Sequence, residues 1–163
     1  MIGEWLKAAS DPSDLWQSVE VILNQYSDDP DECEEFIILD YEDFGVINIQ
    51  QYENLDRVSK LAQALIEHGD AFGVYYEHIA DDQDDINAVI DSFTDAFYGV
   101  FDNMDSFVED YIDNMTCTEI INTYFLYGKL FDYLDKEKIQ YALEISGDYE
   151  FHKHENSVYV FQN

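Results

Sequence analysis

Acidic and aromatic residues are interleaved along this chain, and this combination constrains its fold more than any other feature. Asp and Glu make up 37 of the 163 residues against seven Lys or Arg, so the formal net charge is −30, while Tyr and Phe contribute 13 and 11 residues. An acidic chain with few aromatic residues would stay unfolded, because it could not bury enough apolar surface to offset its loss of backbone entropy. We therefore expect a folded protein that tolerates strong self-repulsion, which favours a strongly basic partner.

The size of the charge is compatible with imitation of DNA. Duplex DNA carries about one negative charge per 1.7 Å of axis, so a charge of −30 corresponds to roughly 50 Å of duplex. Two other interpretations stay open, namely adaptation to a salty cytoplasm and a merely soluble acidic domain. Phosphate backbones and anionic lipids would repel such a surface, so we expect no direct nucleic-acid partner and no membrane partner.

Cysteine usage and hydropathy indicate a cytoplasmic protein. Cys33 and Cys117 are far apart, form no CxxC motif and follow no secretory segment, which predicts reduced thiols. The longest apolar stretches, such as residues 36–39, are far shorter than the roughly 20 residues that span a bilayer. The sequence therefore predicts a soluble chain in a reducing compartment.

The apolar pattern predicts an α+β fold. Apolar residues at helical spacing, with capping residues before them, predict helices over residues 12–26, 54–68, 81–97, 102–115, 120–125 and 135–143. Runs rich in β-forming residues predict strands over residues 35–41, 46–49 and 157–161, with a further strand carrying His152 and His154. Asn54 is expected to cap the second helix and Asp102 the fourth.

These elements predict three small subdomains with unequal charge. We expect an N-terminal α+β subdomain over residues 1–70, an acidic helical middle subdomain over residues 71–116 and a C-terminal α/β subdomain over residues 117–163. The last of these holds eight acids and four bases, whereas residues 1–54 alone hold 14 acids and one base. Repulsion between copies would be weakest in the last third, which makes it the candidate dimer interface.

The helix after Asp102 carries a row of carboxylates. Asp102, Asp105, Glu109 and Asp113 recur at steps of three or four, which places them on one helix face about 4.5 to 6 Å apart along the axis. Asp91 and Asp95 repeat this spacing in the preceding helix. No Lys or Arg is interleaved with these acids, although ordinary protein surfaces mix both signs. The row therefore resembles a sparse line of phosphates.

Catalytic and metal motifs are weak in this sequence. The acidic run at Asp81 fails as an EF-hand, because its sixth position is Ile86 and its twelfth is Ser92. His152 and His154, with Glu155 beside them, lack a third well-spaced metal ligand. The sequence also contains no GxSxG, GxGxxG or P-loop motif. We expect no enzyme, no catalytic residue, no cofactor and no metal, with a metal-assisted hydrolase as an alternative that metal-binding measurements would test.

Nine short segments follow one another in an order that covers nearly the whole chain. They are Gly3-Glu4-Trp5, Asp40-Tyr41-Glu42, Gln51-Tyr52-Glu53, Phe97-Tyr98-Gly99, Val108-Glu109-Asp110-Tyr111-Ile112, Tyr133-Leu134-Asp135, Ala142-Leu143, Gly147-Asp148-Tyr149 and Val158-Tyr159-Val160-Phe161. In this order they resemble the ArdA-type antirestriction proteins of mobile genetic elements and phages. Family members begin with a strand before the Gly-x-Trp element, which this sequence lacks, so the first sheet is expected to be short of an edge strand or completed differently.

The resemblance implies an elongated, three-part protein that is dimeric through its C-terminal part. It also implies carboxylates that imitate the phosphates of bent duplex DNA. Such proteins occupy the DNA-binding groove of type I restriction-modification enzymes, in the methyltransferase core, and protect incoming foreign DNA in the host cytoplasm. A binding-module alternative stays open, namely an acidic inhibitor or chaperone of another basic DNA-binding protein or antiphage nuclease.

The resemblance and the charge pattern together give a set of candidate partner-binding residues. The DNA-mimic carboxylates are expected to be Asp28, Asp29, Asp31, Glu32, Glu34, Glu35, Asp81, Asp84, Asp85, Asp91, Asp95, Asp102, Asp105, Glu109 and Asp113. The dimer interface is expected to include Phe131, Tyr133 and Leu134.

Overall fold

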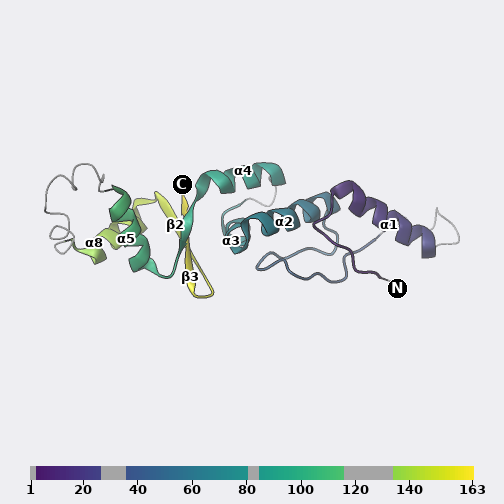
Figure 1. Cartoon of the computed structure of the whole chain (residues 1–163), viewed down its shortest axis with the longest axis horizontal. Coiled ribbons are helices and arrows are strands. Elements are labelled where there is room, and N and C mark those ends of the chain that lie inside the picture. The colour runs from purple at the N-terminus through teal and green to yellow at the C-terminus, as the bar shows by residue number, and fades with distance from the viewer. Residues whose placement is uncertain (1–2, 27–35, 81–84, 116–133) are drawn as a thin grey trace. The chain divides into compact units, whose positions relative to one another are not determined.

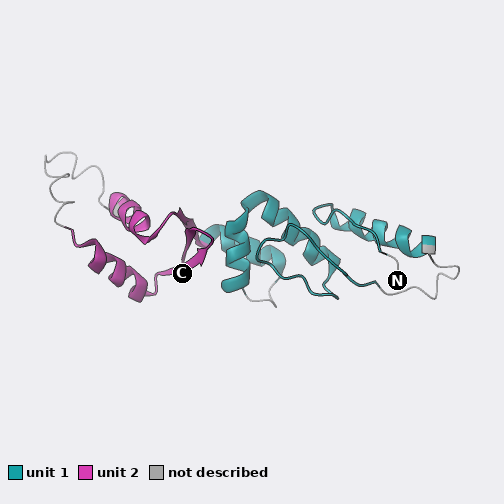
Figure 2. Cartoon of the chain, turned by 90° about the horizontal axis from the view of Figure 1, so that it is seen from below, with its two compact units in different colours: residues 1–95 teal, residues 96–163 magenta. Residues whose placement is uncertain are grey.

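The described part of the chain contains six helices and one three-stranded antiparallel sheet (Figure 1), which confirms the expected α+β class. This computed structural model describes residues 3–26, 36–80, 85–115 and 134–163. Contacts between Cα atoms divide the chain into two compact units, unit 1 over residues 1–95 and unit 2 over residues 96–163 (Figure 2). The expected division into three subdomains is not confirmed by this grouping and stays a prediction.

Unit 1 is built from helices and irregular segments. Its helices are α1 (Pro12–Tyr26), α2 (Leu55–His68), α3 (Asp70–His78) and α4 (Ile86–Ala96), whose last residue falls in unit 2. Leu15 and Val19 on α1 are buried in one cluster with Leu55 of α2, as their helical spacing predicted. No helix among the described residues has both the length and the apolar character needed to cross a membrane.

Local signals set the ends of α2. The side-chain oxygen of Asn54 accepts hydrogen bonds from the backbone N–H groups of Asp56 (2.7 Å) and Arg57 (3.3 Å), which confirms the expected cap. Gly69, with φ of 62°, ends α2 and donates its N–H to the carbonyl of Leu65. The chain turns there directly into α3, which the periodicity did not predict because its residues 71–76 are all buried and show no polar face.

Two strands expected in unit 1 are absent from the described residues, so that prediction is wrong there. Residues 36–41 and 46–49 form no strand, although Ile47 and Ile49 are buried. The N–H of Ile47 bonds to the nearby carbonyl of Phe44 (3.0 Å), and that of Ile38 bonds to Gln51 (2.9 Å). Residues 46–49 thus bury Ile47 and Ile49 without the repeated backbone pairing that defines a ladder, and Leu39 in the first segment is exposed.

Unit 2 contains the sheet, in the order β1-β3-β2. The strands are β1 (Phe97–Phe101), β2 (Tyr149–His154) and β3 (Ser157–Gln162). The sequence predicts the two C-terminal strands. It does not predict β1, because the expected helix over residues 81–97 includes Phe97 and Gly99 is expected only to interrupt the helical pattern. Phe97 pairs with Phe161 of β3, and the register shifts between Phe97 and Gly99. Aromatic and β-branched residues favour strand pairing here over continuation of the helix.

Two helices, α5 (Met104–Met115) and α8 (Lys136–Ser146), complete the described part of unit 2. Asn103 and not Asp102 caps α5, because its side-chain oxygen accepts the N–H of Ser106 at 3.0 Å. Asp135 caps α8 by accepting the N–H of Lys138 at 3.2 Å. The buried core joins both helices to the sheet and consists of Phe107, Val108, Ile112, Leu143, Val158 and Val160. The helix expected over residues 120–125 lies outside the described residues.

Candidate functional site

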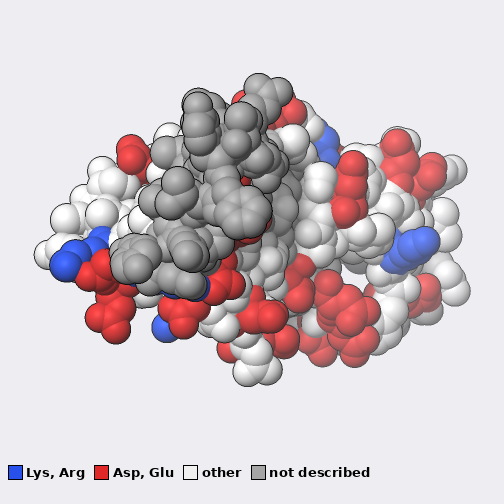
Figure 3. All heavy atoms as spheres, turned by 60° about the vertical axis from the view of Figure 1, so that its left-hand side comes forward, with Lys and Arg blue, Asp and Glu red and all other residues white. Residues whose placement is uncertain are grey.

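Carboxylates cover the surface of the described chain. None of its Asp or Glu residues is buried, and Ser59 is the only buried polar residue among the described ones. The face in Figure 3 shows many Asp and Glu side chains and far fewer Lys and Arg. The negative charge is therefore displayed to solvent and is available to a partner.

In unit 1, three of the expected DNA-mimic carboxylates belong to α4 or precede it. Ile86, Val89 and Phe93 are buried, and the ring of Phe93 lies 5.5 Å from those of Phe72 and Tyr75 on α3. This anchoring leaves Asp85, Asp91 and Asp95 exposed. The exposed carboxylates on α4 are one helical turn apart, about 6 Å along the axis.

Asp85 also caps the start of α4, as the residue directly before the helix. Its side-chain oxygen accepts the backbone N–H of Asn87 at 2.7 Å, and its carbonyl accepts the N–H of Val89 at 3.0 Å. The hydrogen bond from Asn87, aided by the charge of Lys60, holds the pKa of the Asp85 carboxyl below its ordinary value. Asp85 therefore stays ionised and has a structural role besides its expected role in partner binding.

In unit 2, α5 carries a second set of exposed carboxylates. We call Asp105, Glu109 and Asp113 the α5 row; they are exposed, and the buried Phe107, Val108 and Ile112 hold the other side of the helix in the core. Successive carboxylates of the row are about 6 Å apart along the axis. Asp102 is exposed but precedes the helix and is therefore not part of its regular face.

Lys136 of α8 contacts the α5 row. Its ammonium group forms an ion pair with the carboxylate of Glu109, 27 residues earlier in the chain. No Lys or Arg is interleaved with the acids of α5 itself, as the sequence showed, but the tertiary fold brings a base to the centre of the row. No local sequence signal connects two residues so far apart, so this pairing was missed.

A hydrogen-bonded cluster beside the α5 row was also missed. The hydroxyl of Tyr98 on β1 donates to Asp110 at 3.1 Å, and the amide of Asn114 donates to Asp110 at 2.9 Å. Burial raises the pKa of Tyr98, and the nearby Asp110 raises it further. Asp110 therefore binds its own fold and is only partly exposed, whereas the acids of the α5 row are exposed.

The remaining expected site residues have different outcomes. Leu134, an expected dimer contact, is half-buried and packs against the core of unit 2. The α4 carboxylates belong to unit 1 and the α5 row to unit 2. The following lie outside the described residues: Asp28, Asp29, Asp31, Glu32, Glu34, Glu35, Asp81, Asp84, Phe131 and Tyr133.

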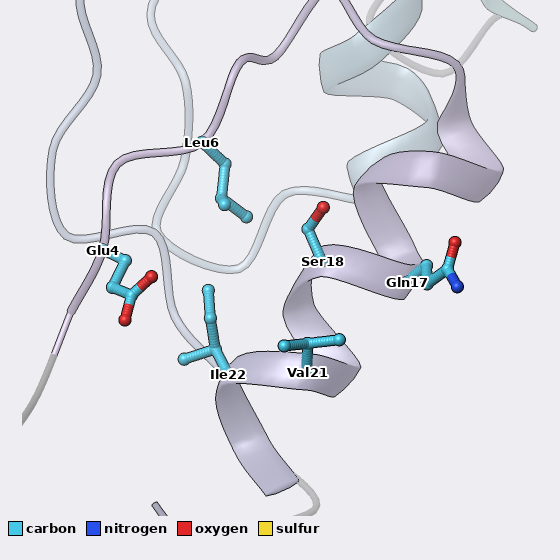
Figure 4. Close-up of a pocket in the computed structure, with 6 residues that line it drawn as sticks. All are labelled: Glu4, Leu6, Gln17, Ser18, Val21 and Ile22. Atoms are coloured by element: carbon cyan, nitrogen blue, oxygen red, sulfur yellow. The ribbon is translucent and has the colours of Figure 1, made fainter. Parts of the chain in front are cut away.

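Two shallow depressions lie on the described surface. The first, about 350 Å³, is bounded by Glu4 and Leu6 of the N-terminal segment and by α1 residues including Ser18 and Ile22 (Figure 4). The second, about 430 Å³, lies beside the start of α5 and includes Asp102 and other polar residues. In the described ranges, no group of three or more His, Cys, Asp or Glu is placed to hold a metal ion.

One of the comparisons with known proteins identifies a family. Neither the curated proteins nor the solved structures gave a match. The family described as antirestriction protein (ArdA) matches residues 1–157, which is nearly all of the 163-residue chain. The chain, with its exposed carboxylates, therefore belongs to the ArdA family of antirestriction proteins.

Proposed function

We propose that this protein inhibits type I restriction-modification enzymes by imitating DNA. Its carboxylates occupy the DNA-binding groove of the methyltransferase core and so protect incoming foreign DNA in the host cytoplasm. The observation that carries the proposal is that none of the described Asp and Glu residues is buried, on a chain with a net charge of −30. Family membership supports restriction enzymes as the class of target.

The proposed mechanism is electrostatic competition. A groove that binds DNA presents Lys and Arg to phosphates, and the fixed carboxylates of α4 and α5 offer the same charge at spacings of about 6 Å. Phosphate contacts position a protein on DNA without reading its bases. One mimic can therefore inhibit enzymes with different recognition sequences. Ion release also makes the affinity fall as the salt concentration rises.

The proposal includes a non-enzymatic homodimer. The ArdA family is not an enzyme family, and inhibition by occupancy requires no turnover. Residues 117–163 hold eight acids and four bases, the least repulsive part of the chain. A second copy would meet the smallest electrostatic penalty there.

A displacement experiment tests the proposed function. Labelled duplex DNA is bound to a type I methyltransferase core, and the protein is added at several salt concentrations. We expect the protein to displace DNA with and without the enzyme's target sequence, and more weakly as salt rises. Unchanged DNA binding and cleavage at saturating protein, across several type I enzymes, would rule out this function, and capture of a different basic protein from host lysate would then favour the alternative.

A further inference from the structure

The two lysines at the start of α8 have different partners. Lys136 reaches across to Glu109, the central carboxylate of the α5 row. Lys138 pairs at 2.7 Å with Asp135, the residue that caps its own helix. The two bases belong to one helical turn, but only the first neutralises a residue of the proposed partner-binding surface.

The environments of the two ion pairs also differ. The side chain of Lys136 is 35% exposed and that of Glu109 is 52% exposed, whereas Lys138 is 84% exposed. The cap at Asp135 fixes the start of α8, and the packing of Leu143 fixes the helix in the core beside α5. The fold therefore holds Lys136 beside the row, and water screens its charge less completely than that of Lys138.

We propose that Lys136 limits the affinity of the protein for its target. This inference rests on the proposed function. Lys136 holds Glu109 in an internal ion pair, so a basic side chain of the target must compete with Lys136 for that carboxylate. The three carboxylates of the α5 row carry a formal charge of −3, and the ammonium of Lys136 reduces the magnitude of this charge by one. The ion pair with Lys136 is thus made at the central carboxylate of the row, between Asp105 and Asp113.

The expected size of the effect follows from the strength of surface ion pairs. An exposed ion pair contributes little free energy, so a lysine or arginine of the target can displace Lys136 from Glu109. Breaking the internal ion pair nevertheless offsets part of the binding free energy that the new pair provides. Removing the ammonium should strengthen binding by about two- to fivefold at low ionic strength. The effect should decrease as salt is added, because these groups are partly exposed.

The experiment compares lysine variants in direct binding to a type I methyltransferase core without DNA. Lys136→Gln removes the charge, and Lys136→Met removes it while keeping an unbranched apolar stem of similar length. Lys138→Gln is the matched control, because it makes the same change in net charge from the same helical turn. We expect both Lys136 variants to bind about two- to fivefold more tightly than the unsubstituted protein, with a smaller change for Lys138→Gln.

A double-mutant cycle assigns the gain to Glu109. When Glu109→Gln is combined with each lysine variant, the difference between Lys136→Gln and Lys138→Gln should disappear. The inference would be overturned if Lys136→Gln and Lys138→Gln bound with equal affinity, or if Lys136→Gln still bound more tightly in the Glu109→Gln background. In either case, binding by the unsubstituted protein would still uphold the proposed function. Absence of binding by the unsubstituted protein would overturn both. Circular dichroism of every variant verifies that the absence of an increase in affinity is not caused by unfolding.

Discussion

The two units of this protein carry their negative charge differently. Residues 1–95 hold 24 acids and three bases, a net charge of −21, whereas residues 96–163 hold 13 acids and four bases, a net charge of −9. In unit 2, Lys136 and Lys138 are paired with carboxylates. In unit 1, the guanidinium of Arg57 lies 5.5 Å from the ring centre of Tyr76, and its nitrogens donate to the Tyr76 hydroxyl at 2.9 and 3.1 Å.

The two units stabilise an acidic fold in different ways. Unit 2 offsets part of its charge with lysines and concentrates eight aromatic or aliphatic residues around a buried core. Unit 1 uses Arg57 to fasten α2 to α3 through an aromatic contact. We therefore expect the stability of unit 1 to depend more strongly on ionic screening, and that of unit 2 to depend more strongly on its core.

The largest effect on stability is expected when the central aromatic ring of unit 2 is removed. Phe107 is fully buried, with its ring 5.2 Å from Phe151 and 5.4 Å from Phe101. Phe107→Ala should lower the free energy of unfolding of unit 2 by about 3–5 kcal/mol, because it leaves a cavity. Circular dichroism during denaturation measures this loss.

Tryptophan fluorescence makes this prediction specific to one unit. Both tryptophans, Trp5 and Trp16, lie in unit 1, so their emission reports that unit. We expect the fluorescence midpoint to stay unchanged in Phe107→Ala and to fall in the matched variant Phe72→Ala, whose ring is fully buried in unit 1. A common midpoint in every variant would show that the two units unfold together and are not independently stable.

A smaller effect is expected from the helix caps. Asn54→Ala removes the acceptor for two backbone N–H groups at the start of α2 and should cost about 1 kcal/mol in unit 1. Asn103→Ala makes the matched change at the start of α5 in unit 2. Fluorescence should detect the first variant and not the second. A shift for Asn103→Ala as large as that for Asn54→Ala would contradict the separation of the units.

Salt should stabilise unit 1 more than unit 2. Like-charged side chains four residues apart on a helix cost a few tenths of a kcal/mol each, and salt screens this repulsion. The test is urea denaturation at low and at moderate sodium chloride concentration. Tryptophan fluorescence reports the stability of unit 1, and the NMR signals of backbone amides in unit 2 report the stability of unit 2. Equal salt dependence in the two units, despite their net charges of −21 and −9, would contradict the comparison.

The smallest effect concerns pH and the cap of α8. The Lys138 side chain, and then its backbone N–H, hold the pKa of Asp135 below its ordinary value of 3.8. The ionised carboxylate therefore stabilises unit 2 above about pH 3.8, and this contribution is lost as the pH falls through the lower folded-state pKa. Asp135→Asn, which keeps a capping oxygen, should be less stable than wild type at neutral pH.

The difference between wild type and Asp135→Asn should vanish in acid. Stability is measured for both proteins from pH 7 down to pH values below 3.8, with Glu144→Gln as a control for loss of one carboxylate from the same helix. A difference that grows as the pH falls would show that the sign of this linkage is wrong.

Sequence reasoning succeeded where a signal is local. The stripes around Val89 and Phe107, the cap at Asn54 and the terminal strand all depend on neighbours within a few residues. It failed for β1, because Phe97 continues the helical period of α4 and only its pairing with Phe161 selects a strand. It also failed for residues 36–41, whose β-rich composition cannot show whether a partner strand exists.

In the candidate site, too, only local features could be predicted from the sequence. Helical spacing was enough to place Asp91, Asp95 and the acids of the α5 row on exposed faces. The same spacing could not show that Lys136 pairs with Glu109, because tertiary packing of α8 against α5 makes that contact. Local chemistry thus predicts which charges are displayed, whereas the fold decides which of them are compensated.

The most direct test separates a shaped carboxylate surface from mere net charge. One variant changes five exposed acids of α4 and α5 to Asn, which also retains the cap of α4. Its substitutions are at Asp85, Asp91, Asp95, Asp105 and Asp113. A control changes five exposed acids elsewhere to Gln. Its substitutions are at Glu20, Glu67, Glu77, Glu137 and Glu144.

Both variants change the net charge from −30 to −25, and inhibition of DNA cleavage by a type I restriction enzyme is measured for each. We expect the Asp→Asn variant to inhibit at least about tenfold more weakly than wild type, while the control stays close to wild type. Equal inhibition by two folded variants would contradict the claim that these carboxylates imitate DNA.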